Sequence, residues 1–311
     1  MMKYRRYAAA ARHIIVESVR KYQRDDPIKL AGTTAYFVVF AVAPILIIIT
    51  AVFGLVVDAQ TVSVRLYEEI ADHIGTQAAE FVQTLVESFR DVDRGLAGTI
   101  VGIAVFLFSS TTFFSVLQKN LNFIWRVRAK PKSNLLNTLR DRLLSFGLIL
   151  SLGFVLLVSL LIDVLVGFLR DLVSGLLSEH ALFLIQPINV VVSFGIVTVI
   201  FVLIFKFLPD TKVPWRVTWV GALVTAVLFT IGKYIFGVAL SLTDVGEMYG
   251  AAGSVVILLV WVFYSSIILY FGAEVTEQYA HYLQLDIEPQ DHAVRIEISE
   301  VDERRGPAAG A

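Results

Sequence analysis

The chain contains no cysteine in its 311 residues. This absence excludes disulfides, thiolate metal ligands and a cysteine nucleophile together. Charged residues are also scarce, at 17% of the sequence, and the formal net charge at pH 7 is only −1. Nucleic-acid-binding domains usually carry a clear excess of basic residues, so the overall charge gives no reason to expect a nucleic-acid partner.

Histidine is sparse, and the motifs of common catalytic centres are missing. The five histidines are scattered along the chain: His13, His73, His180, His281 and His292. None forms an HExxH motif or a comparable metal-ligand spacing. The sequence also has no Walker A lysine motif and no GxSxG nucleophile elbow. We therefore expect no metal, no cofactor and no enzyme activity.

The chain does have long apolar runs, and 57% of its residues are hydrophobic. Soluble domains are about a quarter charged and under half apolar, so lipid is the better solvent for this composition. A helix of about 20 apolar residues crosses the hydrocarbon, where no lipid-facing backbone group can stay unpaired. Six stretches qualify: 31–57, 96–117, 143–169, 181–208, 217–242 and 252–273.

The distribution of Lys and Arg predicts the orientation of these six stretches. Of the 26 basic residues, twenty fall in the segments that would lie on one side of the membrane and four on the other. Cationic loops resist translocation, so the richer side is cytoplasmic. The predicted fold is an all-α polytopic membrane protein with six transmembrane helices and both termini cytoplasmic.

The predicted membrane domain is 31–280, and the segments that lie outside the bilayer differ in character. Segment 1–30 has apolar residues at helical spacing beside arginines, which is typical of an amphipathic helix lying on anionic lipids of the inner leaflet. The basic loop 118–142 is explained in the same way, by anionic lipid and not by nucleic acid. Segment 281–311 is acidic and is expected to be disordered.

The largest external loop, 58–95, is expected to contain amphipathic helices. Phe81, Leu85 and Phe89 recur at a spacing of four residues, which places them on one helical face. Two interpretations stay open. The loop could act as a lid over a pathway, or it could pack on the external ends of the helix bundle.

Ionisable residues inside the apolar stretches are candidates for a substrate pathway. Lys233 lies roughly 15 Å deep in the fifth stretch, and Asp163 roughly 10 Å deep in the third, in the same half of the bilayer. They could form a counter-charged site on a solute or proton path, or a buried ion pair that fixes helix register. Glu247, with Asp244, either adds an acidic mouth above Lys233 or simply solvates a turn.

Four further candidates for the pathway come from the first and sixth stretches. Pro44 cannot donate its backbone hydrogen bond, so it predicts a kink in the first stretch, and Tyr36 precedes that kink. Trp261 is too deep in the sixth stretch for an interfacial belt, which indicates burial against a neighbour or a lined cavity. Tyr264 lies beside it.

Several strings resemble the YihY/BrkB family of bacterial inner-membrane proteins, over about residues 30–280. They are Ala35-Tyr36 with Ala43-Pro44, 121–125 (LNFIW), 207–210 (FLPD), Gly221-Ala222, Lys233, 249–254 (YGAAGS), 261–266 (WVFYSS) and 271–274 (FGAE). The resemblance implies six spans in a bacterial inner membrane and an envelope protein suspected of transport. The name ribonuclease BN has been attached to some members, but these residues do not support a nuclease.

The sequence thus favours a secondary transporter or exporter of a small solute or lipid-like molecule. The alternative is a structural or assembly factor of the envelope that acts through loop 58–95. The expected partners are the bilayer, anionic lipids at the cytoplasmic face and an unknown solute or lipid, with a homo-oligomer left open. Topology also suggests that Glu274 pairs with Arg142 or Lys206.

Overall fold

The computed structural model describes residues 2–53, 59–74, 76–90, 96–130, 185–243 and 252–297, with the single positions 147, 151 and 249. Helices dominate these residues, as the all-α prediction expects, and four short strands are added to them. The helices are α1 (Met2–Arg24), α2 (Pro27–Phe53), α3 (Ala59–Ile74), α4 (Thr76–Arg90), α5 (Leu96–Ile124), α7 (Ile185–Phe207), α8 (Trp215–Ser241) and α10 (Gly253–Tyr282). The strands are β1 (Val127–Ala129), β2 (Thr211–Lys212), β3 (Glu288–Pro289) and β4 (Ala293–Arg295).

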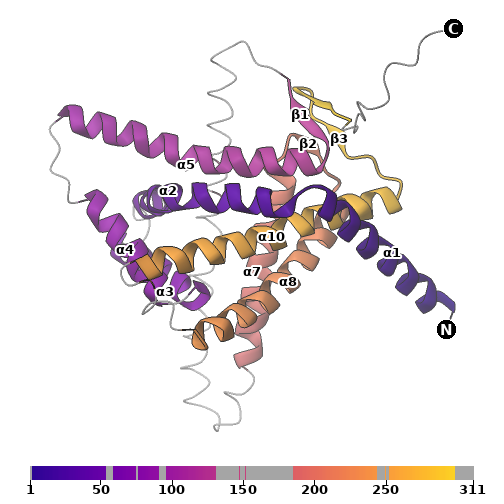
Figure 1. Cartoon of the computed structure of the whole chain (residues 1–311), viewed down its shortest axis with the longest axis horizontal. Helices are drawn as coiled ribbons and strands as arrows, with labels where there is room; N and C mark the ends of the chain where they lie inside the picture. Colours follow the sequence, from indigo (N-terminus) through magenta and orange to yellow (C-terminus); the bar gives the residue numbers. More distant parts are fainter. Residues whose placement is uncertain are drawn as a thin grey trace.

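Five long helices form a fan whose neighbours pack in the order α5, α2, α10, α8, α7. Figure 1 shows these helices converging near the strands and diverging towards the opposite side. We call the region of convergence the strand end. The central helix α10 contacts both α2 and α8, so it joins the two halves of the fan.

Two of the described helices, α8 and α10, are long and apolar enough to cross a membrane. They correspond to the fifth and sixth predicted stretches, and α2, α5 and α7 overlap the first, second and fourth. Apart from positions 147 and 151, the third predicted stretch lies outside the described residues. The membrane class of the chain is therefore supported, while the count of six spans stays a prediction.

The junction between α1 and α2 is a tight bend made by Asp26 and Pro27. Asp26 has a φ of 53°, a left-handed conformation that aspartate tolerates better than most residues. Pro27 then begins α2, where its missing N–H would have had no helical partner. This bend directs α1 away from α2 and across α10, which it contacts at the strand end.

Loop 58–95, predicted to be external, contains the two predicted amphipathic helices, α3 and α4, which pack on each other and on α2 and α10. Figure 1 shows them at the end of the fan opposite the strands. Val82 and Val86 of α4 are buried in the main hydrophobic core. Phe81 is only partly buried, so the face that packs on the bundle is centred on the two valines.

Two small antiparallel ribbons tie the C-terminal segment to the helix bundle. Strand β4 pairs with β1, which follows α5, and β3 pairs with β2, which follows α7. The prediction of a disordered segment from residue 281 is therefore wrong as far as residue 297. Polar composition predicted disorder here, but backbone hydrogen bonds to two distant loops give this segment an ordered structure. Residues 298–311 lie outside the described part of the chain.

Helices α8 and α10 approach each other closely through two reciprocal glycine–threonine contacts. A Cβ placed on Gly221 would overlap the Thr276 side chain, and one placed on Gly272 would overlap Thr225. Each threonine hydroxyl donates to the carbonyl four residues earlier on its own helix, at 2.7 Å. Small residues that let two backbones approach are the usual means of packing helices in lipid.

Candidate functional site

Lys233 lies on α8 and is half-buried. Its neighbour Gly232 is covered by the Tyr264 ring of α10, which would clash with any added Cβ. Within the described part of the chain, no acceptor lies within hydrogen-bonding or ion-pair distance of the Lys233 ammonium. Asp163 and Glu247 fall outside the described residues, so the proposed counter-charges of Lys233 stay predictions.

Trp261 lies inside an aromatic cluster between α8 and α10. Only 5% of its surface is exposed, and its ring centroid is 5.5 Å from that of Phe229 and 4.9 Å from that of Phe236. The sequence left open whether this tryptophan packs on a neighbour or lines a cavity. The contacts with Phe229 and Phe236 give Trp261 a packing role in this structure.

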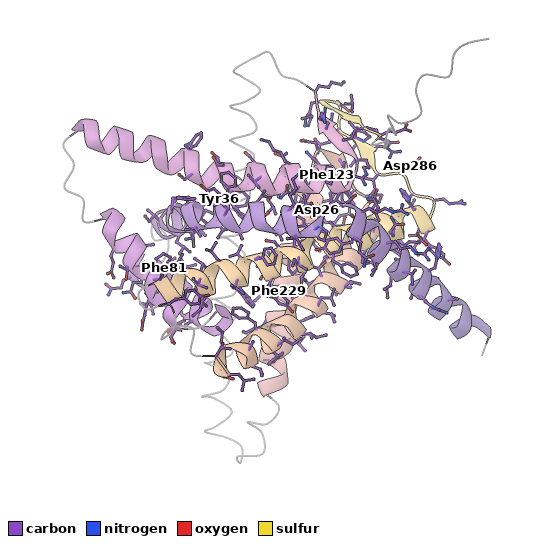
Figure 2. All side chains as sticks on the ribbon, in the orientation of Figure 1. Asp26, Tyr36, Phe81, Phe123, Phe229 and Asp286 are labelled. Carbon is purple, nitrogen blue, oxygen red and sulfur yellow. The ribbon has the colours of Figure 1, made fainter. Side chains whose placement is uncertain are left out.

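Tyr36 and Pro44 lie on α2, at different depths in the molecule. Tyr36 is 59% exposed and makes edge contacts with Phe37 and Phe40 at centroid distances of 5.2 and 5.3 Å. Figure 2 shows its position along α2. Pro44 is buried, and α2 continues through it to Phe53. The structure thus places Tyr264 and Trp261 in the α8–α10 contact and Lys233 next to Gly232, which Tyr264 covers, but Tyr36 lies on an exposed face.

The most polar interior among the described residues is at the strand end, where the sequence analysis proposed no site. Asn120 of α5 is the first centre of this region. Its amide donates to the Tyr270 hydroxyl at 2.9 Å and to the Thr34 hydroxyl at 3.1 Å. Thr34 and Tyr270 also bond to each other at 2.5 Å. Three helices, α2, α5 and α10, are therefore joined through buried hydroxyl and amide groups.

A buried charge cluster lies beside these groups. The Lys21 ammonium of α1 donates to Glu274 at 3.0 Å, to Glu277 and to the carbonyl of Ile124 at 2.7 Å. Glu274 was expected to pair with Arg142 or Lys206. The pairing with Lys206 is wrong. The Lys206 ammonium instead donates to the Val213 carbonyl, and Arg142 lies outside the described residues.

Two further contacts fasten α1 to the bundle. The Arg126 guanidinium, just after α5, donates to the Asp25 carboxylate at 2.5 Å. The Tyr22 hydroxyl donates to the Ile267 carbonyl at 2.6 Å. Burial raises the pKa of the Tyr22 hydroxyl, which stays a proton donor at neutral pH.

Asp210 is the second polar centre of the strand end. Its carboxylate accepts from Asn122 at 2.7 Å and from Gln118 at 3.1 Å, and it lies 2.8 Å from His292 Nε2. Its backbone N–H donates to the Asn122 side chain at 2.8 Å. Asp210 therefore links the segment after α7 to α5 and to the C-terminal ribbons.

A signal for this site was present in the sequence. The strings 121–125, 207–210 and 271–274, which carried the family resemblance, meet at the strand end. Trp125 of the first string donates to the carbonyl of Ala273 in the third at 3.1 Å, and Asn122 bonds Asp210 of the second. What the strings did not reveal was Lys21, because it is separated from Glu274 by about 250 residues.

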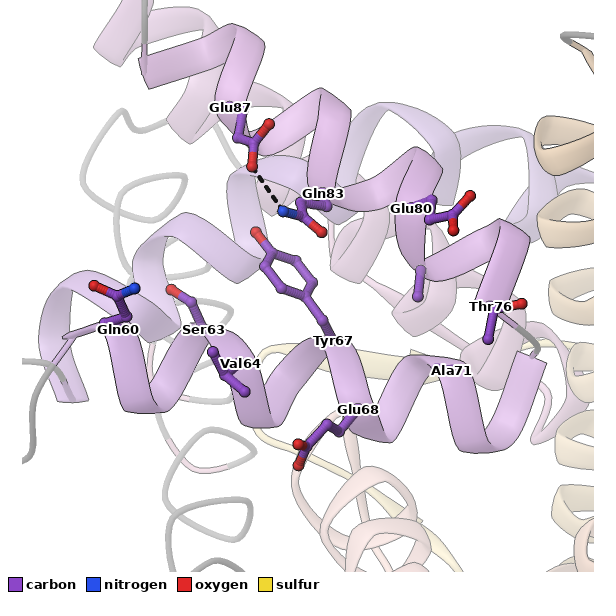
Figure 3. A pocket seen from close by; sticks show the side chains of 11 residues that line it. Gln60, Ser63, Val64, Tyr67, Glu68, Ala71, Thr76, Glu80, Gln83 and Glu87 are labelled. Atoms are coloured by element: carbon purple, nitrogen blue, oxygen red, sulfur yellow. Dashed lines mark hydrogen bonds between the residues drawn. The ribbon is translucent and has the colours of Figure 1, made fainter.

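A groove of about 780 Å³ lies between α3 and α4. Most of the residues that line it have polar side chains, among them Gln60, Tyr67, Glu68, Glu80 and Glu87. Figure 3 shows the Tyr67 ring between the two helices and the hydrogen bond from Gln83 to Glu87, 2.8 Å long. The residues that the structure describes contain no group of three His, Asp or Glu placed to hold a metal ion.

Comparison with known proteins identifies the chain as a membrane protein. The family model described as virulence factor BrkB matches residues 18–297, and the chain belongs to this family. The match begins three residues before Lys21 and ends two residues after β4, so it includes the whole strand end.

Curated relatives are described only as UPF0761 membrane proteins. One from Azotobacter vinelandii is 29% identical over 258 residues, which are 82% of this chain and 60% of the relative. One from Halorhodospira halophila is 27% identical and covers 83% of this chain and 55% of the relative. The chain thus spans little more than half the length of these two.

A relative from Aeromonas salmonicida is closer in length. It is 26% identical over 261 residues, which are 82% of this chain and 85% of the relative. No solved structure matches the chain.

Proposed function

We propose that the protein is a secondary transporter or exporter of a small solute or lipid-like molecule. The observation that carries this proposal is Lys233, a half-buried cation in an apolar helix with no acceptor among the described residues. A charged side chain inside a bilayer is costly, so it persists where it serves a solute path or is paired. Its positive charge favours an anionic group on the transported molecule.

The arrangement of the helices supports the same proposal. The fan is held together at the strand end by buried hydrogen bonds and ion pairs, while its helices diverge towards the opposite side. One fixed end and one diverging end suit a transporter that exposes its site to one side at a time. In this proposal the membrane is the bacterial inner membrane, the chain crosses it six times, and the strand end faces the cytoplasm.

The proposal also assigns a role to α1 at the inner leaflet. Ile15, Val16 and Val19 are exposed large apolar residues on a helix that also carries Arg12 and Arg20. A helix with this pattern lies in the headgroup region of anionic lipid. Both the six-span topology and the lipid contact remain parts of the proposal.

The transport proposal is tested by replacing Lys233 with methionine, which removes the charge and keeps the length of the side chain. In proteoliposomes we expect K233M to lower the flux of an anionic probe, such as a fluorescent phosphatidylglycerol analogue, at least tenfold. A loss of about 1.4 kcal/mol of binding at the site corresponds to this factor.

Lys212→Met is the matched control, because Lys212 is exposed in β2 and lies outside the apolar helices. K212M should transport as the wild type does. If K233M moves every molecule that the wild type moves at an unchanged rate, Lys233 is not part of a transport site.

The groove between α3 and α4 favours a second candidate function, assembly of envelope components. The groove has a volume of about 780 Å³, which can hold a short segment of a partner protein. The pair of helices α3 and α4 that forms it is anchored to the bundle by Val82 and Val86. A photo-crosslinker at Gln83 should capture a defined partner if this function holds, whereas one at exposed Gln284 should not. A partner captured at Gln83, together with no measurable flux, would favour this candidate over transport.

A further inference from the structure

Among the residues that the structure describes, the charge cluster of Lys21, Glu274 and Glu277 has two carboxylates and one cation. Both glutamates bond the same Lys21 ammonium. The neighbouring ion pair, Asp25 with Arg126, is neutral by itself. With both glutamates ionised, the cluster would therefore carry a net charge of −1 inside the protein.

The burial of these side chains makes that excess charge unfavourable. The Glu274 side chain is 0% exposed and the Glu277 side chain 8% exposed, while Lys21 is 19% exposed. A buried charge without compensation tends to be neutralised by uptake of a proton. The charged groups that face Glu274 are Lys21 and Asp25 on the α1 side and Glu277 on its own helix, and the titratable hydroxyl of Tyr22 on α1 also faces it.

Glu274 also has a vacant position for a proton. Its Oε2 accepts from Lys21, but its Oε1 is buried and has no hydrogen-bond partner among the described residues. A metal cation bound at Oε1 would be repelled by the Lys21 ammonium. A proton avoids this problem because it forms a short O–H bond and needs no coordination shell.

We propose that Glu274, Glu277 and Lys21 form a proton-binding site that couples transport to a proton gradient. Protonation forms an O–H bond on a glutamate oxygen, and the donor is a water-borne hydronium ion that leaves as water. Glu277 and Lys21, which are slightly exposed, provide the path from solvent to Glu274. Release returns the proton to water by the same path.

The position of the site connects proton binding to movement of the fan. Lys21 belongs to α1, the two glutamates belong to α10, and α10 joins the two halves of the fan. With both glutamates ionised, Lys21 is attracted by two carboxylates; with one protonated, it is attracted by one. The strength of the contact between α1 and α10 therefore changes with the proton. The coupling role rests on the proposed transport function, but proton binding does not.

Proton binding is tested by infrared difference spectroscopy on the full-length protein in nanodiscs, titrated from acidic to alkaline pH. We expect the wild type to show one buried carboxylic acid that loses its proton on titration. Glu274→Gln and Glu277→Gln should each lose this signal, because either change leaves one carboxylate for one ammonium. Lys21→Met should instead bind one more proton than the wild type.

Glu288→Gln is the control, because Glu288 is exposed in β3 and outside the cluster. It should keep the wild-type signal. The proposal is overturned if the wild type shows no buried carboxylic acid, or if both glutamine variants retain it. It is also overturned if sodium, with pH held constant, displaces the signal, because the site would then bind sodium. Thermal unfolding confirms that each variant is folded.

Coupling is tested with the fluorescent lipid probe in proteoliposomes under an imposed pH gradient. E274Q should exchange the probe but lose the acceleration by the gradient, whereas E288Q should keep it. Unchanged acceleration in E274Q would overturn the coupling role. If the wild type moves no probe, the transport proposal fails, and the infrared titration still decides whether the site binds a proton.

Discussion

At the scale of single residues, two asparagines on α5 hold the strand end together. Asn120 donates to Thr34 and Tyr270, and Asn122 forms a two-way contact with Asp210. An amide side chain offers both donors and an acceptor, so one residue satisfies groups on several elements. These contacts bring together helices that are far apart in the sequence.

Asn122→Ala should destabilise the protein by about 1–3 kcal/mol, because it leaves the buried Asp210 carboxylate and N–H with fewer partners. Gln83→Ala removes an exposed amide hydrogen-bonded to Glu87 and should change stability by about 0.5 kcal/mol or less. Thermal unfolding of both variants in the same detergent measures the difference. Equal stability of N122A and the wild type would contradict the role given to this contact.

At the scale of elements, the contact between α8 and α10 depends on the absence of side chains at two glycines. Gly221 and Gly272 each accept a threonine of the opposite helix, and Gly232 accepts the Tyr264 ring. The site candidates Lys233 and Trp261 lie along this same contact. Close packing here therefore positions the central part of the proposed pathway.

Gly221→Ala should destabilise the α8–α10 contact by about 1–3 kcal/mol, because the new methyl group overlaps Thr276. The matched control is Gly237→Ala on the same helix, where a Cβ meets open space. That change should be neutral or stabilising by up to about 1 kcal/mol, since alanine is the better helix former.

The double variant G221A/T276A should recover part of the stability lost in G221A, because it removes Thr276 Oγ1, the atom that the new methyl group would approach most closely. The measurement is again thermal unfolding. Equal thermal stability of G221A and G237A would contradict the close contact between α8 and α10 at Gly221.

At the scale of the whole molecule, the absence of cysteine makes the predicted topology directly testable. A cysteine introduced at Gln83 on α4 should react with a membrane-impermeant maleimide in intact cells. One introduced at Asp286, next to β3, should react only after the membrane is permeabilised. Labelling of Asp286→Cys from outside would reverse the orientation assigned from Lys and Arg.

Some features could be predicted because they depend on local composition. The apolar stretches predicted helices that coincide with α2, α5, α7, α8 and α10, and the spacing of apolar residues in 58–95 predicted α3 and α4. The family was also recognised correctly from short strings. For the helices, the signal lies within about 30 neighbouring residues, where hydrophobic periodicity is informative.

The structure was needed for the C-terminal strands and for the role of Trp261, because both depend on residues that are distant in the sequence. The acidic composition of segment 281–311 suggested disorder, yet β3 and β4 in this segment are ordered by backbone pairing with β2 and β1. The tryptophan at 261 could not be assigned to packing until Phe229 and Phe236 were placed around it.

By itself, the sequence determined that this protein is a mostly helical membrane protein, and it predicted which segments cross the bilayer. Those properties follow from how apolar each segment is, and they need no knowledge of its neighbours. Only the tertiary structure decided that Lys21 lies against Glu274 and Glu277, since the sign and burial of a charge cluster depend on which distant side chains meet. Electrostatic free energy depends on distance in space, and distance along the chain does not predict it.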